Sequence, residues 1–183
     1  MINEIYSHVK PSNTKAKRLF ILLMGLSALL AAGAVALNIL GGPYKGVVAF
    51  CGCVSIVAAV FIYTKYIGVE YYYDVTFDSE GTAVFVVRQV TGKRESTLCR
   101  IDLWSITKIE KLTAKERSAH KAQAGFKRYF YLPTLSPDSV VLITIRSEDE
   151  NAEIVIEAND EFASMLKGYA REARESRFDG EEY

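Results

Sequence analysis

Two uncharged apolar runs lie close together near the beginning of the chain and constrain its fold more than any other feature. Residues 19–40 and residues 47–64 contain no charged side chain. A helix needs roughly 20 apolar residues to cross a bilayer, and the aromatic residues Tyr63 and Tyr66 extend the second run into the interfacial zone. We therefore predict an integral membrane protein with a transmembrane hairpin over residues 19–67.

The turn between the two runs spans only residues 41–46, so we expect two antiparallel helices in contact. Small residues in both runs would let the backbones approach each other. These are Gly25, Ser27, Ala28, Ala32, Gly33, Gly52, Ser55 and Ala59. A cleaved signal peptide is the alternative for the first run, but its apolar region is usually about 7 to 15 residues long. The second run, so close behind, makes a hairpin the simpler interpretation.

Positive charges predict the orientation of the hairpin. Four cations precede the first run, and one lies between the runs: Lys10, Lys15, Lys17 and Arg18, against Lys45. Because cationic flanks stay on the cytoplasmic side, the tail of residues 1–18 should be cytoplasmic. Two spans return the chain to the same side, which places the following domain in the cytoplasm of a multi-pass cell-membrane protein. The three cysteines form no disulfide framework, which agrees with a reducing compartment for Cys99.

After residue 68 the apolar pattern alternates, which is typical of half-buried strands. Seven short strands are predicted, over residues 69–77, 82–90, 95–103, 106–112, 126–132, 140–146 and 152–157. Strands this short, joined by turns, favour an antiparallel sheet. The sequence thus predicts a mostly β-sheet domain over residues 68–176, followed by a polar tail over residues 177–183.

The last part of this domain should be a helix. Asn159 or Asp160 can cap it, and apolar residues follow at helical spacing. They are Phe162, Met165, Leu166, Tyr169, Ala170 and Ala173. A seven-stranded sheet that curls into a partly open barrel leaves apolar side chains at one end, and a terminal helix laid over that end buries both surfaces.

Four stretches carry a resemblance to a known family. They read VEYYYDVTF, RESTLCRIDLWSITKIEKL, YFYLPTLSPDSVVLITI and IVIEANDEFASMLKGY. With the hairpin before them, they resemble the pleckstrin-homology-like (PH-like) domains of small two-span membrane proteins of Gram-positive bacteria. The resemblance covers about the last 115 residues and implies a fold, a seven-stranded antiparallel, partly open barrel capped by a C-terminal helix. It implies no reaction.

The best known ligands of the PH superfold are phosphoinositides, which lipid-binding members hold with Lys and Arg around the first strand turn. Here that turn is residues 78–81, and it contains Asp78 and Glu80. Two acids in place of cations argue against specific headgroup binding at this turn.

A different stretch is locally basic. Six cations lie around the interruption between the fourth and fifth strands: Lys111, Lys115, Arg117, Lys121, Lys127 and Arg128. In a domain tethered to a bilayer they would contact anionic lipid, each contributing on the order of 1 kcal/mol near the surface. The alternative is a solvated connecting loop or a short amphipathic helix.

No metal, cofactor or catalytic site is predicted. Cys51 and Cys53 stand two residues apart on a helix and point about 200° away from each other, so they cannot share an ion without further ligands. Neither His8 nor His120 lies near a cysteine cluster or has an obvious Ser or Cys partner. The chain also lacks a Gly-x-Ser-x-Gly elbow and a phosphate-binding glycine loop. We therefore expect a protein that is not an enzyme.

Zero net charge gives no electrostatic attraction to nucleic acid. The remaining hypothesis is a membrane-anchored cytoplasmic interaction or scaffold module, with a protein partner bound through a sheet edge or through the hairpin. The alternative is an accessory subunit of a membrane transport or envelope complex. The single tryptophan, Trp104, is expected in the domain core, although it could instead mark a peptide groove.

Overall fold

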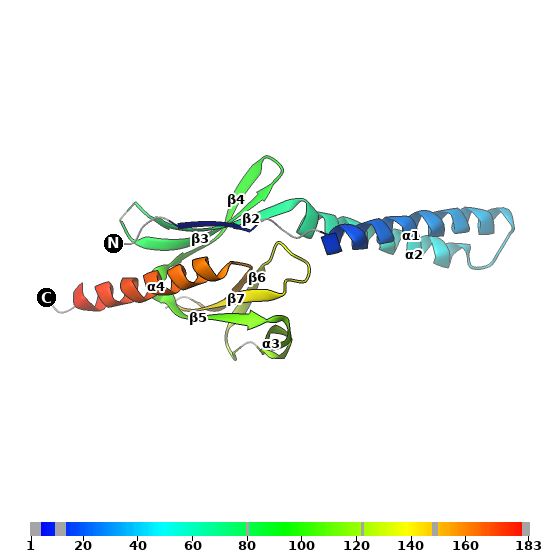
Figure 1. The fold of residues 1–183 in the computed structure, drawn as a ribbon. Helices are drawn as coiled ribbons and strands as arrows, with labels where there is room; N and C mark the ends of the chain where they lie inside the picture. Colours follow the sequence, from blue (N-terminus) through cyan, green and yellow to red (C-terminus); the bar gives the residue numbers. More distant parts are fainter. Residues whose placement is uncertain (1–4, 10–13, 80, 122, 148–149, 181–183) are drawn as a thin grey trace. The chain divides into compact units, whose positions relative to one another are not determined.

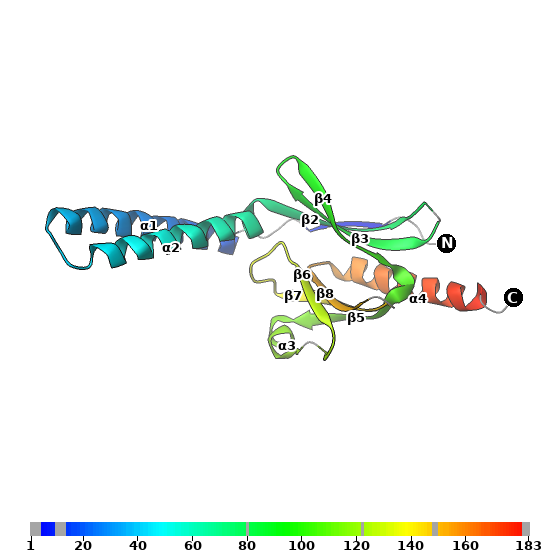
Figure 2. The ribbon, with the colours of Figure 1, turned by 180° about the vertical axis from the view of Figure 1, so that it is seen from behind.

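A computed structural model describes residues 5–9, 14–79, 81–121, 123–147 and 150–180. The chain divides into two compact units (Figures 1 and 2). The hairpin unit is Pro11–Val69, and the sheet unit combines Met1–Lys10 with Glu70–Tyr183. The predicted order is confirmed at this level, since two apolar helices are followed by strands and a C-terminal helix. Lys10, Glu80 and residues 181–183 lie outside the described residues.

The hairpin unit contains α1 (Thr14–Ile39) and α2 (Lys45–Ile62), and α2 continues into a π-helical turn, η1 (Tyr63–Ile67). Both helices are long and apolar enough to cross a membrane. They lie side by side in both views (Figures 1 and 2). Because α1 begins at Thr14, the cations Lys15, Lys17 and Arg18 belong to its first turns rather than to a tail.

Small residues form the contact between the two helices. Gly52, Ser55 and Ala59 are the buried residues of α2, at a spacing that places them on one face. The hydroxyl of Ser55 donates a hydrogen bond to the carbonyl oxygen of Leu23 in α1, at 3.0 Å. A Cβ atom at Gly52 would lie 3.5 Å from the Cβ atom of Leu30, an ordinary van der Waals distance, so Gly52 lies directly against α1. Part of the predicted small-residue set is therefore used within the hairpin itself.

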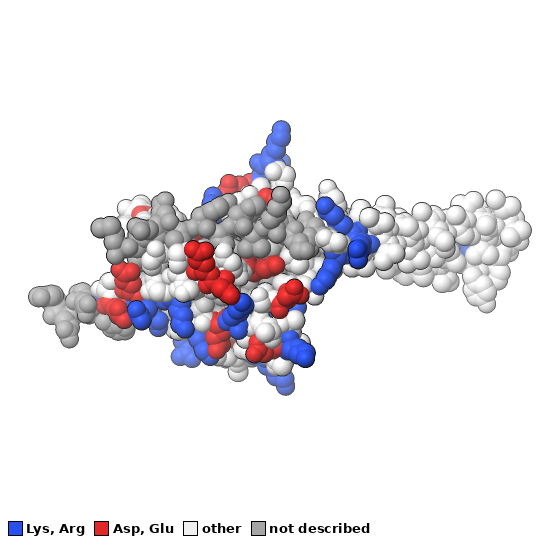
Figure 3. All heavy atoms as spheres, in the orientation of Figure 1, with Lys and Arg blue, Asp and Glu red and all other residues white. Residues whose placement is uncertain are grey.

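Large apolar side chains cover the outside of the hairpin. The most exposed include Ile21, Leu22, Leu29, Ile39, Val47, Phe50 and Val57, each with more than 60% of its surface accessible. Figure 3 shows a long surface without charge over most of both helices. An exposed apolar surface of this extent is typical of contact with a membrane or a partner.

The first sheet has the strand order β1-β2-β3-β4. Its strands are β1 (Ile5–Val9), β2 (Val69–Phe77), β3 (Ala83–Thr91) and β4 (Arg94–Asp102). β1 pairs antiparallel with β2, so that Ile5 lies opposite Val75 and Val9 lies opposite Tyr71. The first sheet thus joins the segment before α1 to the segment after α2.

The second sheet has the strand order β5-β7-β8-β6. Its strands are β5 (Ile106–Thr113), β6 (Lys127–Tyr131), β7 (Ser139–Arg146) and β8 (Asn151–Ile156). The 3₁₀ turn η2 (Leu103–Ser105) leads from β4 into this sheet. β6 runs parallel to β8, while the β5–β7 and β7–β8 pairs are antiparallel.

The strand arrangement differs in three respects from the single, partly open antiparallel barrel predicted from the sequence. Among the described residues, the seven strands after the helices divide three and four between two sheets, which do not close into a barrel. β1 adds a fourth strand to the first sheet, from the segment predicted as a tail. Finally, β5 pairs directly with β7, so the segment between β5 and β6 carries the chain to the far edge of the second sheet, where β6 pairs in parallel with β8.

The C-terminal helix α4 (Asp160–Gly180) supplies part of the core of the sheet unit. Asn159 caps it as predicted, because its Oδ1 accepts a hydrogen bond from the backbone N–H of Phe162 at 2.8 Å. Phe162, Leu166 and Ala170 are buried on one face of the helix, which confirms this part of the predicted stripe. The ring of Phe162 lies 6.4 Å from that of Phe85 in β3.

Two further aromatic residues show how the sheet unit is closed. Tyr73 of β2 is fully buried, and its hydroxyl donates a hydrogen bond to the carbonyl oxygen of Tyr131 in β6 at 2.7 Å, which joins the two sheets. Trp104 is only half-buried rather than in the core, and the Arg177 guanidinium of α4 lies 3.7 Å from its ring centroid. That distance is typical of a cation–π contact.

Candidate functional site

The basic stretch, residues 111–128, contains a short helix, α3 (Ala114–Ala119). Thr113 and Glu116 cap the N-terminal end of this helix. Thr113 Oγ1 accepts from the N–H of Glu116 at 3.4 Å, and Glu116 Oε2 accepts from the N–H of Thr113 at 2.8 Å. This reciprocal pair is a capping box. The backbone hydrogen bond from Thr113 keeps the pKa of Glu116 below its ordinary value, so this carboxylate is ionised and engaged.

A buried carboxylate in β8 binds the chain that follows α3. Glu153 is fully buried, and its Oε2 accepts hydrogen bonds from Nε of Arg128 at 2.8 Å and from Nη2 of the same side chain. Its Oε1 accepts from the backbone N–H of Gln123 at 3.3 Å. Nη1 of Arg128 also donates to the carbonyl oxygen of His120 at 3.3 Å. We call Glu153, Arg128, Gln123 and His120 the Glu153 clamp.

The charge state of the clamp follows from its contacts. Burial opposes ionisation of Glu153, but the hydrogen bonds from Arg128 and Gln123 and the charge of Arg128 outweigh it and keep the pKa of Glu153 below its ordinary value. His120 Nε2 lies 3.5 Å from Glu153 Oε1 without a hydrogen bond in this geometry. The clamp at neutral pH is therefore an ionised, buried Glu–Arg pair.

The six predicted cations do not form one surface. Arg128 belongs to the clamp, Lys111 forms an ion pair with Asp160 of α4, and Lys127 Nζ lies 3.4 Å from Glu150. The remaining cations are Lys115, Arg117 and Lys121. No ion pair joins these three to an acid in the part of the chain that the structure describes.

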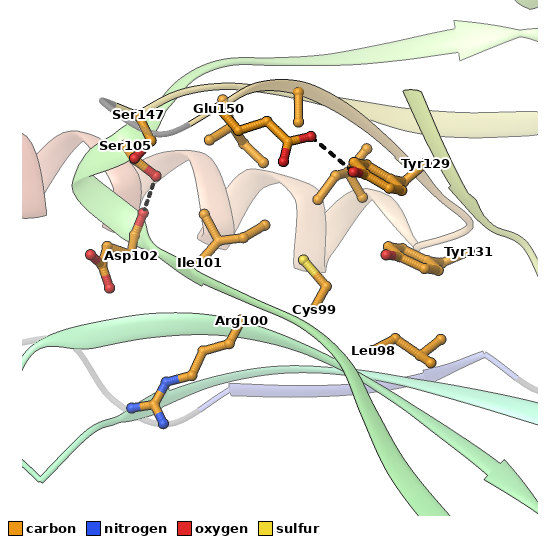
Figure 4. Close-up of a pocket in the computed structure, with 13 residues that line it drawn as sticks. Leu98, Cys99, Arg100, Ile101, Asp102, Ser105, Tyr129, Tyr131, Ser147 and Glu150 are labelled. Carbon is orange, nitrogen blue, oxygen red and sulfur yellow. Dashed lines mark hydrogen bonds between the residues drawn. The ribbon is translucent and has the colours of Figure 1, made fainter. Parts of the chain in front are cut away.

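A cleft of about 460 Å³ opens in the sheet unit between β4 on one side and β6, β7 and β8 on the other. β4 and β6 are the end strands of their sheets, so each has one edge that no described strand pairs. Figure 4 shows Cys99 and Ile101 of β4 on one side and the rings of Tyr129 and Tyr131 on the other. Buried Ile145 completes the apolar lining. We call this the β4–β6 cleft.

The two tyrosine rings form a flat wall of the cleft. Their planes differ by only 6°, with centroids 6.3 Å apart. The Tyr129 hydroxyl donates to Glu150 Oε1 at 2.8 Å (Figure 4). On the opposite side Leu98 is 38% exposed and lies at a register shift in the β3–β4 pair. The cleft thus combines a flat aromatic wall with an edge strand that contributes Leu98, Cys99 and Ile101.

Two titratable groups of the cleft, Cys99 and Tyr131, stay protonated at neutral pH. Burial raises the pKa of the Cys99 thiol to about 11. Burial also raises the pKa of Tyr131 to about 12. A thiol that stays protonated is a poor nucleophile and a poor metal ligand. No group of three or more His, Cys, Asp or Glu side chains that could hold a metal is found within the described ranges.

Neither the burial of Glu153 nor the β4–β6 cleft was predicted from the sequence. Glu153 alternates with Ile154 and so reads as a solvent-facing residue, yet it is fully buried. The available signal was an acid in the middle of an otherwise apolar strand. The cleft lies between strands of two sheets, and nothing in the local pattern shows which strands end a sheet.

Comparison of the chain with protein-family models, with curated proteins and with solved structures found no match.

Proposed function

We propose that the protein is a membrane-anchored, non-catalytic binding module, with α1 and α2 crossing the bilayer and the sheet unit in the cytoplasm. The pairing of β1 with β2 carries this proposal. β1 precedes α1 and β2 follows α2, so two crossings would bring the chain back to the face where it started and leave both strands free to pair in one sheet. Cleavage of the first apolar run as a signal peptide would instead remove β1 from the sheet.

The surface of the hairpin supports an anchoring role. The small residues Gly52, Ser55 and Ala59 are used in the contact between α1 and α2, and the outer surface carries large aliphatic and aromatic side chains. Lipid tails suit such a surface, whereas helix–helix association in membranes favours small residues. This favours anchoring over the alternative of an accessory subunit held in a membrane complex through the hairpin. Lys15, Lys17 and Arg18 at the start of α1 support a cytoplasmic sheet unit.

We assign the sheet unit to the PH-like superfold, as in the two-span proteins of Gram-positive bacteria. The supporting features are seven strands after the hairpin in two sheets and a C-terminal helix whose buried face meets β3 through Phe162 and Phe85. The parallel β6–β8 pair is a departure from the antiparallel pattern. The assignment concerns fold and carries no ligand with it.

The binding function is proposed for the β4–β6 cleft, with an extended segment of a protein partner as its occupant. An edge strand presents unpaired backbone N–H and C=O groups, which another strand can pair with. Two of the strands that line the cleft, β4 and β6, are end strands of this kind. A segment with large apolar residues at alternate positions would meet Ile101 on one side and the wall of Tyr129 and Tyr131 on the other.

Site-specific photocrosslinking in cells tests this assignment. A benzophenone amino acid in place of Leu98, at the rim of the cleft, should give a discrete protein adduct. The same amino acid in place of Arg94, at the start of β4 beside the turn that joins β3 to β4, should not. Ser147 is exposed and lines the cleft, so Ser147→Trp should block the cleft and remove the Leu98 adduct. Equal adducts from both positions, or an adduct that survives Ser147→Trp, would contradict the assignment.

A further inference from the structure

We propose that residues 113–121 form a contact site for anionic lipid headgroups and that Glu153 is the residue that positions it. The inference rests on the proposed membrane anchoring. It narrows the six predicted cations to Lys115, Arg117 and Lys121.

Cations outnumber acids in this segment by three to one. Lys115 and Lys121 are exposed, Arg117 is half-buried, and none of the three forms an ion pair with an acid among the described residues. The acid within the segment, Glu116, is engaged in the capping box with Thr113. Lys115 and Lys121 thus face solvent, and the half-buried Arg117, whose charge also acts on Glu157, adds to a net positive segment that complements a negatively charged surface.

The Glu153 clamp gives the segment a fixed shape. Thr113 caps α3 at one end, and the carbonyl oxygen of His120 and the N–H of Gln123 are bound at the other end through Arg128 and Glu153. Ordering a free backbone residue costs about 1–2 kcal/mol, so a segment already held in place loses less entropy on binding. Glu153 therefore acts on the site through its partners and never touches lipid.

The short connection to the hairpin favours a lipid surface over a soluble acidic partner. One residue, Gly68, separates η1 from β2, so an anchored hairpin keeps the sheet unit close to headgroups at all times. Tethering makes the contact effectively intramolecular, so individually weak cation–lipid contacts are enough. A free acidic protein would gain nothing from the tether.

A fluorescence experiment on the full chain in nanodiscs tests the contact. An environment-sensitive probe is attached to Ser118→Cys in a Cys51→Ser, Cys53→Ser, Cys99→Ser background. Phosphatidylglycerol in phosphatidylcholine nanodiscs should blue-shift the probe, and added salt should reverse the shift. Lys115→Gln, Arg117→Gln, Lys121→Gln should lower the contact equilibrium on the order of a hundredfold. The matched control Lys93→Gln, Arg94→Gln, Lys167→Gln, at exposed cations elsewhere, should respond like the parent.

The outcomes separate this inference from the anchoring. A chain that alkaline carbonate releases from membranes would overturn the anchoring and this inference with it. A chain that stays in the bilayer but gives the same probe signal with and without phosphatidylglycerol would overturn this inference alone. A response to soluble polyglutamate without a response to phosphatidylglycerol would also overturn it, in favour of an acidic protein.

Glu153→Gln tests the positioning role. This variant keeps all three cations and the size of the side chain but loses the charge that holds Arg128. A spin label at position 118 should become more mobile, and the lipid response should weaken. Phe162→Leu, which loosens the packing against Phe85 and leaves the residues of the clamp unchanged, should lower the melting temperature without changing the lipid response. If both variants change the lipid response equally, Glu153 only stabilises the sheet unit and does not position residues 113–121.

Discussion

Replacing Arg128 by alanine is expected to destabilise the sheet unit by about 3–5 kcal/mol, because it leaves the carboxylate of Glu153 buried without its counter-charge. The guanidinium donates two hydrogen bonds to this carboxylate, whose own side chain has no accessible surface. The measurement is denaturant unfolding of the full chain in mild detergent, followed through the fluorescence of the single tryptophan, Trp104.

Two variants serve as controls for this prediction. Lys127→Ala removes the neighbouring cation, whose exposed ion pair with Glu150 should contribute less than about 1 kcal/mol. The double variant Arg128→Met, Glu153→Leu removes both charges and should recover most of the loss, because an apolar pair of similar size needs no counter-charge. If Arg128→Ala costs no more than Lys127→Ala, the clamp is not a buried ion pair.

The Arg128–Glu153 ion pair also makes the stability of the sheet unit depend on pH. The pKa of Glu153 is lower in the folded protein than its ordinary value, so the unfolded chain binds the proton more readily. The stabilisation is therefore present above the ordinary carboxyl pKa, about 4.3, and is lost as the pH falls through the lower folded value. Glu153→Gln should flatten the acid limb of the stability profile and leave it unchanged in shape above about pH 6.

Replacing Phe162 by alanine is expected to cost about 3–5 kcal/mol, the range found when a buried phenylalanine is truncated to alanine. Phe162 is 1% exposed and packs against Phe85, which is fully buried. It also lies in the first turn of α4, so its loss weakens the end of the helix that Asn159 caps. Chemical unfolding measures the loss, and limited proteolysis should show earlier cleavage within α4.

Phe130→Ala is the matched control, because Phe130 is also an aromatic residue of the sheet unit but is 50% exposed. Its removal should change the free energy of unfolding by less than about 1 kcal/mol, since little buried surface is lost. Equal losses for the two variants would show that α4 is not packed through Phe162.

The elements of the fold could be predicted because each depends on a local pattern. The two apolar runs became α1 and α2, the alternating segments became seven strands, and the stripe through Phe162 and Leu166 became the buried face of α4. The pairing of the strands could not be predicted in this way. β1 spans five residues, Ile5–Val9, too short for its alternation to be distinctive, and its partner β2 lies beyond the whole hairpin.

The candidate site shows the same limit. The cations of the basic stretch were visible as residues, but which of them are engaged depends on acids far away in the sequence, such as Asp160 for Lys111 and Glu153 for Arg128. The β4–β6 cleft depends on which strands end their sheets, a property of the whole sheet order. The sequence therefore predicted the cations but not the acids that pair with some of them.

The most direct test of the account is the accessibility of two single cysteines in sealed spheroplasts. With Cys51, Cys53 and Cys99 replaced by serine, one variant carries Tyr44→Cys in the turn between α1 and α2, and the other carries Ser118→Cys in the sheet unit. We predict that a membrane-impermeant maleimide labels position 44 from outside and position 118 only after lysis. Identical behaviour of the two positions, or labelling of position 118 before lysis, would contradict a hairpin that crosses the membrane twice and keeps the sheet unit in the cytoplasm.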